Sequence, residues 1–519
     1  MNASVVNAAN GSVAVNPQRL LWAGWVAILA GGMGFGIRGG IFNAWGAEFG
    51  FTAAQLGAIS GAGFSGFCFG IVLGGLICDR IGYGKLVIGA FALHLLSAIV
   101  TVSAGGTGAY ASLYWGMFIF SYANGTLEAV ANPLVATLFR HDRTHYLNLL
   151  HASWPAGLIL GGLVGWGLGD LLHLSWRIQL VSYLLPTAIY GVMFFGQAMP
   201  QSQASQQRLS LSDMFKDVGI LGSLIVCFLL ALFAQDALGL PAVWAYGIGA
   251  VLLLGTGVLT RFSLGSFLLF VLFLTLGLVG AVELGTDGWI QNITGNLLTP
   301  GQGKLLFVLT SATMFGLRLC AGSVERRMGN SPPNMLFICA LLACAGLTLT
   351  SGIITFAGAT CALVLYAAGK SFFWATLLAI ASDRFPRTGA IAISLMGGIG
   401  MMSAGLLGTP GLGYAKDRFA AEALRDQAPA VYEQYKSATP SQFLYFREVH
   451  GLDGKKLGEI QAQAASGVPL SPEARAVHNA GVSGDRSTLK VDAAIPATLA
   501  AIFLGLAIYF RSIGGYRRL

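Results

Sequence analysis

The feature that most constrains this chain is a series of apolar runs, most of them about 20 residues long, the length that a helix needs to cross roughly 30 Å of hydrocarbon. Of the 519 residues, 55% are hydrophobic and only 10% are charged, whereas soluble domains average about 25% charged residues. This composition argues against a soluble multidomain enzyme and predicts an all-α membrane protein. We expect fourteen spans, at 20–43, 53–78, 86–105, 112–138, 148–171, 178–198, 218–235, 241–260, 264–290, 304–323, 335–355, 358–382, 389–412 and 493–511.

The distribution of charge predicts how the chain lies in the membrane. Residues 414–492 form one polar segment with ten basic and ten acidic residues, so the rest of the chain carries the whole net charge of +8. Cytoplasmic loops are enriched in Lys and Arg. With a cytoplasmic N-terminus, fifteen basic residues of short loops fall inside and only Arg177 and Lys304 outside. We therefore expect a multi-pass protein of the plasma (inner) membrane, with both termini cytoplasmic, 414–492 outside, and no nucleic-acid partner.

A charged loop motif occurs twice in the chain, at the ends of the second and tenth predicted spans. In each copy acidic and basic residues adjoin a glycine, which suits a tight turn. The copies lie 246 residues apart. A helix–loop motif repeated in two halves is typical of many secondary transporters. The predicted motif residues are Gly75, Asp79, Arg80 and Gly82 in the first copy, and Glu325 and Arg326 in the second.

This repeated motif resembles the signature between the second and third helices of the major facilitator superfamily. The resemblance implies two six-helix bundles, which we expect at residues 1–198 and 264–519. Residues 199–263 would then form a cytoplasmic linker and an extra central helix pair. The polar segment 414–492 would be an extracytoplasmic insertion between the last two helices.

A second resemblance concerns the fourth predicted span. Its sequence Leu127-Glu128-Ala-Val-Ala131-Asn132-Pro133 is similar to the fucose–galactose–glucose:proton symporters, in which the matching glutamate takes part in proton coupling. The resemblance implies sugar transport and a proton-coupling role for Glu128. The first span departs from that group, which has an aspartate in its first helix, because residues 37–40 contain Arg38 and no acid.

Six charged residues fall inside the predicted spans, where a charge costs about 2.5–3.5 kcal/mol on insertion scales and marks function by default. They are Arg38, Glu128, Glu283, Asp287, Arg318 and Lys370. The internal repeat aligns Arg38 with Glu283 and Asp287, and Glu128 with Lys370, each time with opposite sign. We therefore expect two charge couples between the bundles, around one site. Arg318 is expected to extend its charge toward the inner membrane surface.

Amide and aromatic side chains recur beside these charges at helical spacing. Asn124, Glu128 and Asn132 are four residues apart, and so are Glu283, Asp287 and Gln291. Carboxylates and amides next to tryptophans suit a sugar ring, whose hydroxyls meet the polar groups while its C–H face meets the indole. The predicted substrate- or proton-binding residues are Arg38, Asn124, Glu128, Asn132, His151, Trp154, Glu283, Asp287, Gln291, Lys370 and Trp374.

These features predict a secondary-active transporter that imports a sugar or sugar derivative, including a sugar acid, by proton symport with alternating access. We expect a monomer in the lipid bilayer that is not an enzyme and has no cofactor or metal, because P-loop, zinc and dinucleotide patterns are absent from the sequence. One alternative is a drug or metabolite:proton antiporter, although the fifth span lacks the Gly-Pro-x-x-Gly-Gly signature of such exporters. Another alternative is a transporter-like nutrient sensor.

Overall fold

The computed structural model describes residues 15–516 except 140–142, 200–214, 321–323, 325–326, 328–330 and 386–388. Of the predicted loop motif, Glu325, Arg326 and the side chains of Asp79 and Arg80 lie outside the described residues. Gly82 has a φ of 84°, a left-handed conformation that favours glycine, and it joins a helix ending at Ile81 to one beginning at Tyr83. The predicted tight turn is therefore confirmed, and Gly75 lies inside the preceding helix.

Apart from two isolated β-bridges within residues 436–452, the described regular elements are helices. The N-terminal group comprises α1 (Pro17–Gly39), α2 (Phe42–Phe49), α3 (Ala53–Ile81), α4 (Tyr83–Val102), η1 (Gly106–Gly108), α5 (Ala109–Leu138), α6 (Arg143–His151), α7 (Ser153–Gly165), the π-helix η2 (Trp166–Leu171), α8 (Trp176–Val181) and α9 (Leu184–Phe194). A central pair follows, formed by α11 (Gly219–Asp236) and α12 (Ala242–Leu259).

The C-terminal group contains the remaining helices. They are α13 (Phe267–Val279), the π-helix η4 (Gly280–Gly285), α14 (Thr286–Leu297), α15 (Pro300–Leu319), α17 (Pro332–Thr350), α18 (Phe356–Lys370), α19 (Phe373–Arg384), α20 (Gly389–Ser403), the π-helix η5 (Ala404–Gly408), α21 (Thr409–Gln427), α22 (Pro429–Tyr435), α23 (Gly454–Ala465), α24 (Pro472–Asp492) and α25 (Ala494–Ser512).

Several helices begin where side-chain oxygens satisfy the free backbone N–H groups of a first turn. The side chain of Asn16 accepts from the Arg19 N–H at 3.0 Å, and that of Thr299 accepts from the Gln302 N–H at 3.3 Å. Both helices also have proline at a first position, where its missing N–H costs nothing. The polar residues between apolar runs therefore set where α1 and α15 start.

Eleven helical stretches in the described part of the chain are long and apolar enough to cross a membrane. They coincide with eleven of the fourteen predicted spans, including both helices of the pair at 218–260. Helices also overlap the other three ranges, 112–138, 178–198 and 304–323, where the structure describes α5, α8 with α9, and α15. The first and last of these carry more polar residues, and the middle one is interrupted between α8 and α9. The all-α membrane fold is confirmed, and the count of fourteen spans stays a prediction.

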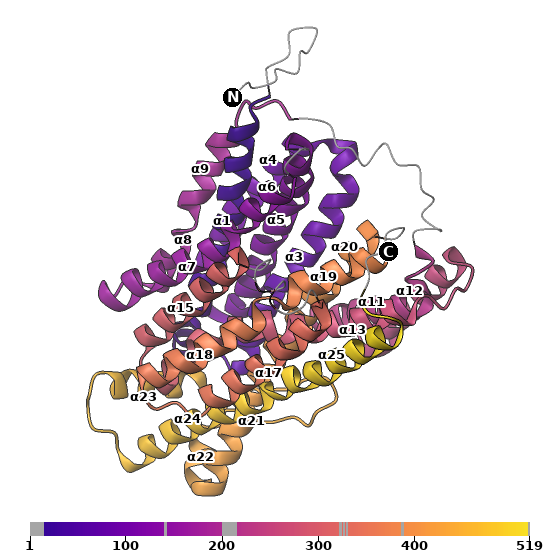
Figure 1. Cartoon of the computed structure of the whole chain (residues 1–519). Coiled ribbons are helices and arrows are strands. Elements are labelled where there is room, and N and C mark those ends of the chain that lie inside the picture. The colour runs from indigo at the N-terminus through magenta and orange to yellow at the C-terminus, as the bar shows by residue number, and fades with distance from the viewer. Residues whose placement is uncertain are drawn as a thin grey trace.

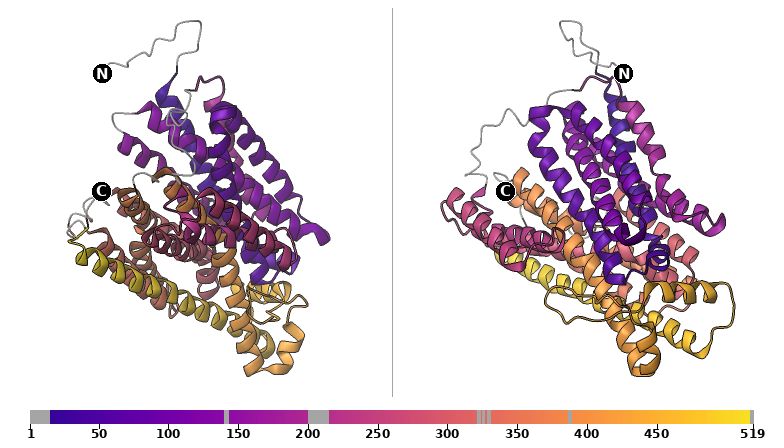
Figure 2. Two further views of the ribbon diagram at one scale, coloured as in Figure 1. Left: turned by 90° about the vertical axis from the view of Figure 1, so that its right-hand side faces the viewer. Right: turned by 180° about the vertical axis from the view of Figure 1, so that it is seen from behind.

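The two groups of helices converge at one end of the molecule and separate toward the end that carries the termini (Figures 1 and 2). At the convergent end α3 packs on η5 and α21, and α7 packs on α15. The backbones touch there. A Cβ added to Gly61 would lie 2.0 Å from the Gly405 oxygen, and one added to Gly57 would lie 2.4 Å from the Thr409 oxygen. Only glycine permits this approach. We call this close contact between the two groups of helices at the convergent end the seam.

The polar segment 414–492 lies at this convergent end, which we call the insertion end (Figure 1). α21 extends to Gln427, α24 packs along it, and α23 packs against α2 of the N-terminal group. Within the insertion, Ala428 separates the end of α21 from α22, and α23 follows at Gly454–Ala465. The insertion therefore joins both groups of helices.

Candidate functional site

Arg38 is buried inside the N-terminal group with few polar partners. Helical side chains point toward the N-terminus of their helix, and the Arg38 Nη1 accordingly donates to the Gly34 carbonyl at 3.0 Å. The guanidinium carbon lies 3.9 Å from the centre of the Phe120 ring and 5.3 Å from that of Tyr183. Only 2% of the residue is exposed. Among the described residues, its Nε and Nη2 have no hydrogen-bond partner, and no carboxylate forms an ion pair with it.

A hydrogen-bond chain beside this arginine holds Asn124. His94 Nε2 lies 2.9 Å from the Asn124 Oδ1, and because an amide oxygen only accepts, the imidazole donates. His94 Nδ1 lies 2.9 Å from the Tyr190 hydroxyl. The Tyr183 hydroxyl, which interacts electrostatically with Arg38, donates to the His94 carbonyl at 2.8 Å. The Asn124 Nδ2 has no partner within the described chain, so this region holds unused donors from two residues.

The predicted polar face of the fourth span is one face of α5. Phe120, Asn124, Glu128 and Asn132 follow one another every four residues, and Phe120 and Glu128 are therefore about 12 Å apart along the helix. The Glu128 Oε1 lies 4.0 Å from His151 Nδ1, with 18% of the carboxylate side chain and 48% of the imidazole side chain exposed. The predicted couple between Glu128 and Lys370 is not formed. Glu128 instead has a loose contact inside its own group.

The C-terminal group pairs its buried charges internally. Lys370, which is 1% exposed, forms an ion pair with Asp287, and Arg318 Nη2 lies 3.2 Å from the Glu283 Oε1. The predicted couple of Arg38 with Glu283 and Asp287 is therefore wrong in this structure, because both acids have cations of their own group. The expectation that Arg318 extends away from the site is also wrong, since it contacts Glu283 and donates to the Ser371 carbonyl at 3.3 Å.

The two acids lie in and directly after a π-helical turn. Glu283 lies in η4, and Asp287 follows in α14. A π-turn adds a residue to the helical turn, so the spacing of four residues assumed across this segment does not place both acids on one continuous α-helical stripe. The Tyr366 hydroxyl donates to the Val282 carbonyl at 2.8 Å, within this turn. Sequence spacing could not reveal the π-turn.

The other predicted site residues divide between the seam and the packing of aromatic rings. Gln291 lies at the seam, where its Nε2 donates across the groups to the Gly36 carbonyl at 2.8 Å. Trp154 packs on Phe35 and Phe67, with ring centres 5.3 and 6.0 Å away. Trp374 packs against Gly400. The structure thus brings together Arg38 with Asn124, Glu128 with His151, and Glu283 and Asp287 with Lys370, but it does not join these sets.

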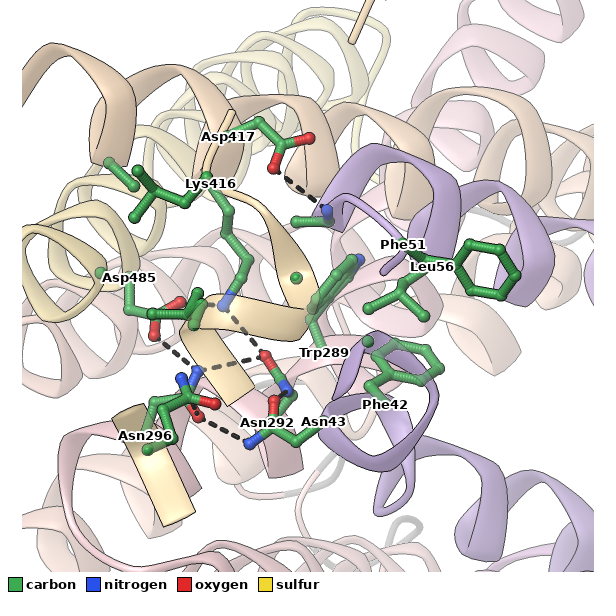
Figure 3. A pocket seen from close by; sticks show the side chains of 18 residues that line it. Phe42, Asn43, Phe51, Leu56, Trp289, Asn292, Asn296, Lys416, Asp417 and Asp485 are labelled. Carbon is green, nitrogen blue, oxygen red and sulfur yellow. Dashed lines mark hydrogen bonds and ion pairs between the residues drawn. The ribbon is translucent and has the colours of Figure 1, made fainter. Parts of the chain in front are cut away.

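A polar network that sequence reasoning missed closes the insertion end (Figure 3). Lys416 forms an ion pair with Asp485 and donates to the Asn292 Oδ1 at 2.9 Å. Asn296 donates to Asp485 at 2.8 Å and accepts from Asn43 at 2.9 Å. Asn43 in turn accepts from Asn292 at 2.5 Å. Because Asn43 belongs to the N-terminal group, this network ties the two groups together.

Asp417 provides a second tie at the same end. Its carboxylate is buried and accepts from the backbone N–H groups of Ala53 at 3.0 Å and Ala54 at 2.8 Å, which begin α3. It also accepts from the Ser441 hydroxyl at 2.6 Å. A carboxylate at a helix N-terminus is favoured by the free N–H groups and the helix dipole. A residue from the C-terminal group therefore caps a helix of the N-terminal group.

Comparison with known proteins identifies the fold of this chain. A bacterial homologue of the human lysosomal transporter Spinster, in an inward-facing and unoccupied conformation, superposes with a TM-score of 0.66 and 13% identity, over 96% of this chain and 98% of that one. The xylose transporter XylE from E. coli, in a partially occluded inward-open conformation, gives 0.52 and 13%, over 76% of this chain and 91% of that one. At such low identity these similarities concern the fold alone.

Sequence comparison identifies the family. The cis,cis-muconate transport protein of Acinetobacter baylyi is 28% identical over 197 residues, which are 37% of this chain and 46% of that protein. The match therefore spans less than half the length of this relative. The sequence model described as Major Facilitator Superfamily matches residues 24–409, which is well over half of the chain. The chain belongs to the Major Facilitator Superfamily, a family of transporters, and is a multi-pass membrane protein.

Proposed function

We propose that this protein imports a small organic carboxylate, such as a sugar acid, by proton symport with alternating access. The observation that carries the proposal is the buried Arg38 without a counterion among the described residues. A buried charge is costly unless it is paired, and two aromatic faces compensate it by about 2 kcal/mol or somewhat more. A carboxylate would add charge-assisted hydrogen bonds in the planar geometry that a guanidinium matches.

The donor groups around Arg38 support an anionic substrate over a neutral sugar. Arg38 Nε and Nη2 and the Asn124 Nδ2 are all donors without a partner in the described chain. A carboxylate supplies two oxygens that only accept, whereas a sugar hydroxyl brings a donor with each acceptor. The relative from Acinetobacter baylyi, which is named for cis,cis-muconate, a dicarboxylate, agrees with this chemistry.

Glu128 and His151 are the proposed proton carriers. Glu128 lies about two helical turns from Phe120 along α5, on the side of Arg38 that faces away from the insertion end, and His151 is the last residue of α6. Their contact of 4.0 Å and partial exposure suit groups that exchange protons with water. Glu283 and Asp287 already form ion pairs with Arg318 and Lys370, so we assign proton transfer to the acid whose contact is looser.

The proposal includes an orientation and a state. The positive-inside rule favours cytoplasmic termini in the plasma membrane, which places the insertion end outside the cell. The seam, the network around Lys416 and the Asp417 cap all lie at that end, which supports an inward-facing state. The closed end must release these contacts for substrate to enter. We further propose that the protein acts as a monomer.

The test uses purified protein in liposomes loaded with a pH-sensitive dye. Radiolabelled D-gluconate, cis,cis-muconate and D-glucose are supplied outside, with and without an inward proton gradient. We expect gradient-driven accumulation of at least one carboxylate, with acidification of the lumen, and none of glucose. Glucose accumulation without carboxylate transport would contradict the proposal.

Two variants assign the roles of the residues in the same assay. Arg38→Gln should abolish carboxylate uptake, because it removes the cation that binds the anion. Glu128→Gln should still exchange internal for external substrate but should fail to accumulate it against a gradient. Lys455→Gln, which removes a positive charge from an exposed position, is the matched control and should transport as the wild type does. Full accumulation by Glu128→Gln would contradict the proposed role of Glu128 in proton coupling.

A further inference from the structure

A pocket beside the seam is separate from the cluster around Arg38. It lies at the insertion end and is lined from both groups of helices, by Gly39, Gly40, Asn43, Gly169 and Gln179 on one side and by Gln291, Asn292 and Lys304 on the other. Its volume is about 220 Å³, far above the roughly 10–15 Å³ that one water molecule needs. The pocket adjoins that of Figure 3, because Asn43 and Asn292 line both.

Two buried amide oxygens in this pocket have no donor. Gln179 and Gln291 are 6% and 3% exposed, and neither Oε1 has a hydrogen-bond partner in the described part of the chain. Their nitrogens are already used, since the Gln179 Nε2 donates to the Leu174 carbonyl at 2.9 Å and the Gln291 Nε2 to that of Gly36 at 2.8 Å. These hydrogen bonds fix the orientation of each amide. The two amide oxygens are therefore free to accept hydrogen bonds from a molecule bound in the pocket.

A neutralised cation lies between the two amides. Lys304 Nζ donates to Asp170 at 2.8 Å and to the Gly165 carbonyl at 3.2 Å, which leaves one of its three donors. A Cβ added at Gly40 would lie 3.0 Å from the Gln291 oxygen and 2.9 Å from the Lys304 Cε. One added at Gly169 would lie 2.9 Å from the Gln179 oxygen and 3.0 Å from Lys304 Nζ. The two glycines thus leave space beside both amides and the ammonium.

We propose that this pocket is a second solute site, which binds the hydroxyl groups of a small polyhydroxylated molecule. Hydroxyls donate to the two amide oxygens and accept from the remaining Lys304 donor. A carboxylate brings only acceptors, which would meet two acceptors here and a cation already neutralised by Asp170. The site therefore differs in chemistry from Arg38 and does not depend on the proposed carboxylate transport. A molecule with hydroxyls and one carboxylate has groups suited to each of the two sites.

Binding of three probes to the purified full-length protein tests the site. D-Sorbitol carries hydroxyls only, hexanoate a carboxylate only, and D-gluconate both. The variants are Gly169→Ala, whose new methyl group presses on the Gln179 amide, and Gln179→Met, which removes one acceptor at similar length. The control is Gly167→Ala in the same π-helix, where an added Cβ meets nothing within 4 Å apart from its chain neighbours and the backbone of its own helix.

We expect the wild type to bind sorbitol, and both test variants to bind it about three- to tenfold more weakly, the effect of losing a neutral hydrogen bond. Gluconate should still bind to both variants, because its carboxylate is held at the separate Arg38 site. Hexanoate affinity should not change, and Gly167→Ala should bind all three probes normally. Equal weakening of hexanoate, unchanged sorbitol affinity in both variants, or no binding of sorbitol to the wild type would overturn the proposal. Arg38→Gln should retain sorbitol binding, so a failure of the carboxylate proposal is seen separately in hexanoate.

Discussion

The N-terminal and C-terminal groups of helices treat buried charge in opposite ways. In the C-terminal group, Lys370 pairs with Asp287 and Arg318 with Glu283. In the N-terminal group, Arg38 is about as deeply buried as Lys370, but it contacts aromatic faces and lies near donor groups that have no partner in the described chain. An ion pair stabilises one arrangement of its own helices, whereas a buried cation without a counterion can bind an anionic substrate. The difference indicates which half of the molecule recognises charge on the substrate.

The largest expected effect on stability comes from Lys370→Met. The substitution leaves Asp287, whose side chain is 13% exposed, without a cation, and breaking a buried pair in this way costs about 3–5 kcal/mol. Thermal unfolding in detergent should show a clear fall in Tm. Lys370→Met/Asp287→Leu should recover most of it, because the pair is then replaced by apolar groups. Arg38→Gln, by contrast, should keep the Tm or raise it. A large loss of stability in Arg38→Gln would break the comparison between the two groups.

A smaller loss is expected from Arg318→Gln. One third of the Arg318 side chain is exposed, whereas Glu283 is buried. Leaving a buried acceptor without its partner costs about 1–3 kcal/mol. Unfolding measurements on Arg318→Gln, Glu283→Gln and the double variant give the coupling between the two side chains. If the two single effects simply add, the pair does not compensate charge in the way described.

Asp417→Ala tests whether paired groups at the insertion end hold the two groups of helices together. Loss of a helix cap costs about 1 kcal/mol, which corresponds to roughly a fivefold change in an equilibrium. The reporter is Ser60→Cys in a chain without native cysteines, at a buried position beside Gly288 and Thr409. We expect this cysteine to react several-fold faster with an impermeant maleimide when Asp417→Ala is present than when Asp417 is retained. Glu459→Ala, at an exposed acid on α23, is the control. Equal reaction rates with and without Asp417→Ala would show that the Asp417 cap does not hold the two groups of helices together.

The smallest effect concerns an exposed pair of the N-terminal group. Burial would raise the pKa of Glu48, but hydrogen bonds from Arg177 and Trp176 outweigh it and hold that pKa below the usual glutamate value. The stabilisation is therefore present at neutral pH and is lost as the pH falls through the lowered pKa. Glu48→Gln should cost less than about 1 kcal/mol at pH 7, and the difference from the wild type should vanish in acid. A difference that grows in acid would contradict this assignment.

The sequence predicted elements whose cause is local. Apolar runs of membrane-crossing length mark the helices, and Gly82 marks a turn that needs positive φ. The helix α24 was not predicted, because it is polar and charged and is stabilised by packing on α21. His94 was also missed, although a lone histidine in an apolar run was a usable signal. The residue boundaries of the two bundles stay a prediction.

The pairing of charges could not be predicted from spacing. Counting residues from the repeated motif placed Glu283 and Asp287 opposite Arg38, but partner choice depends on tertiary contacts, which bring Arg318 and Lys370 to the two acids. The residue types were informative, since five of the six predicted intramembrane charges form ion pairs or close contacts. The exception, Arg38, carries the functional proposal.

The most direct test of the account compares binding of D-gluconate and its neutral amide, D-gluconamide, to the purified wild type and to Arg38→Gln. Both probes share the same hydroxyls, so only the carboxylate differs. Hydrogen bonds to a charged group contribute about 1.5–3 kcal/mol, so the wild type should prefer gluconate about ten- to a hundredfold. In Arg38→Gln that preference should disappear while gluconamide affinity remains. An undiminished preference for gluconate in Arg38→Gln would contradict the assignment of Arg38 as the carboxylate-binding residue.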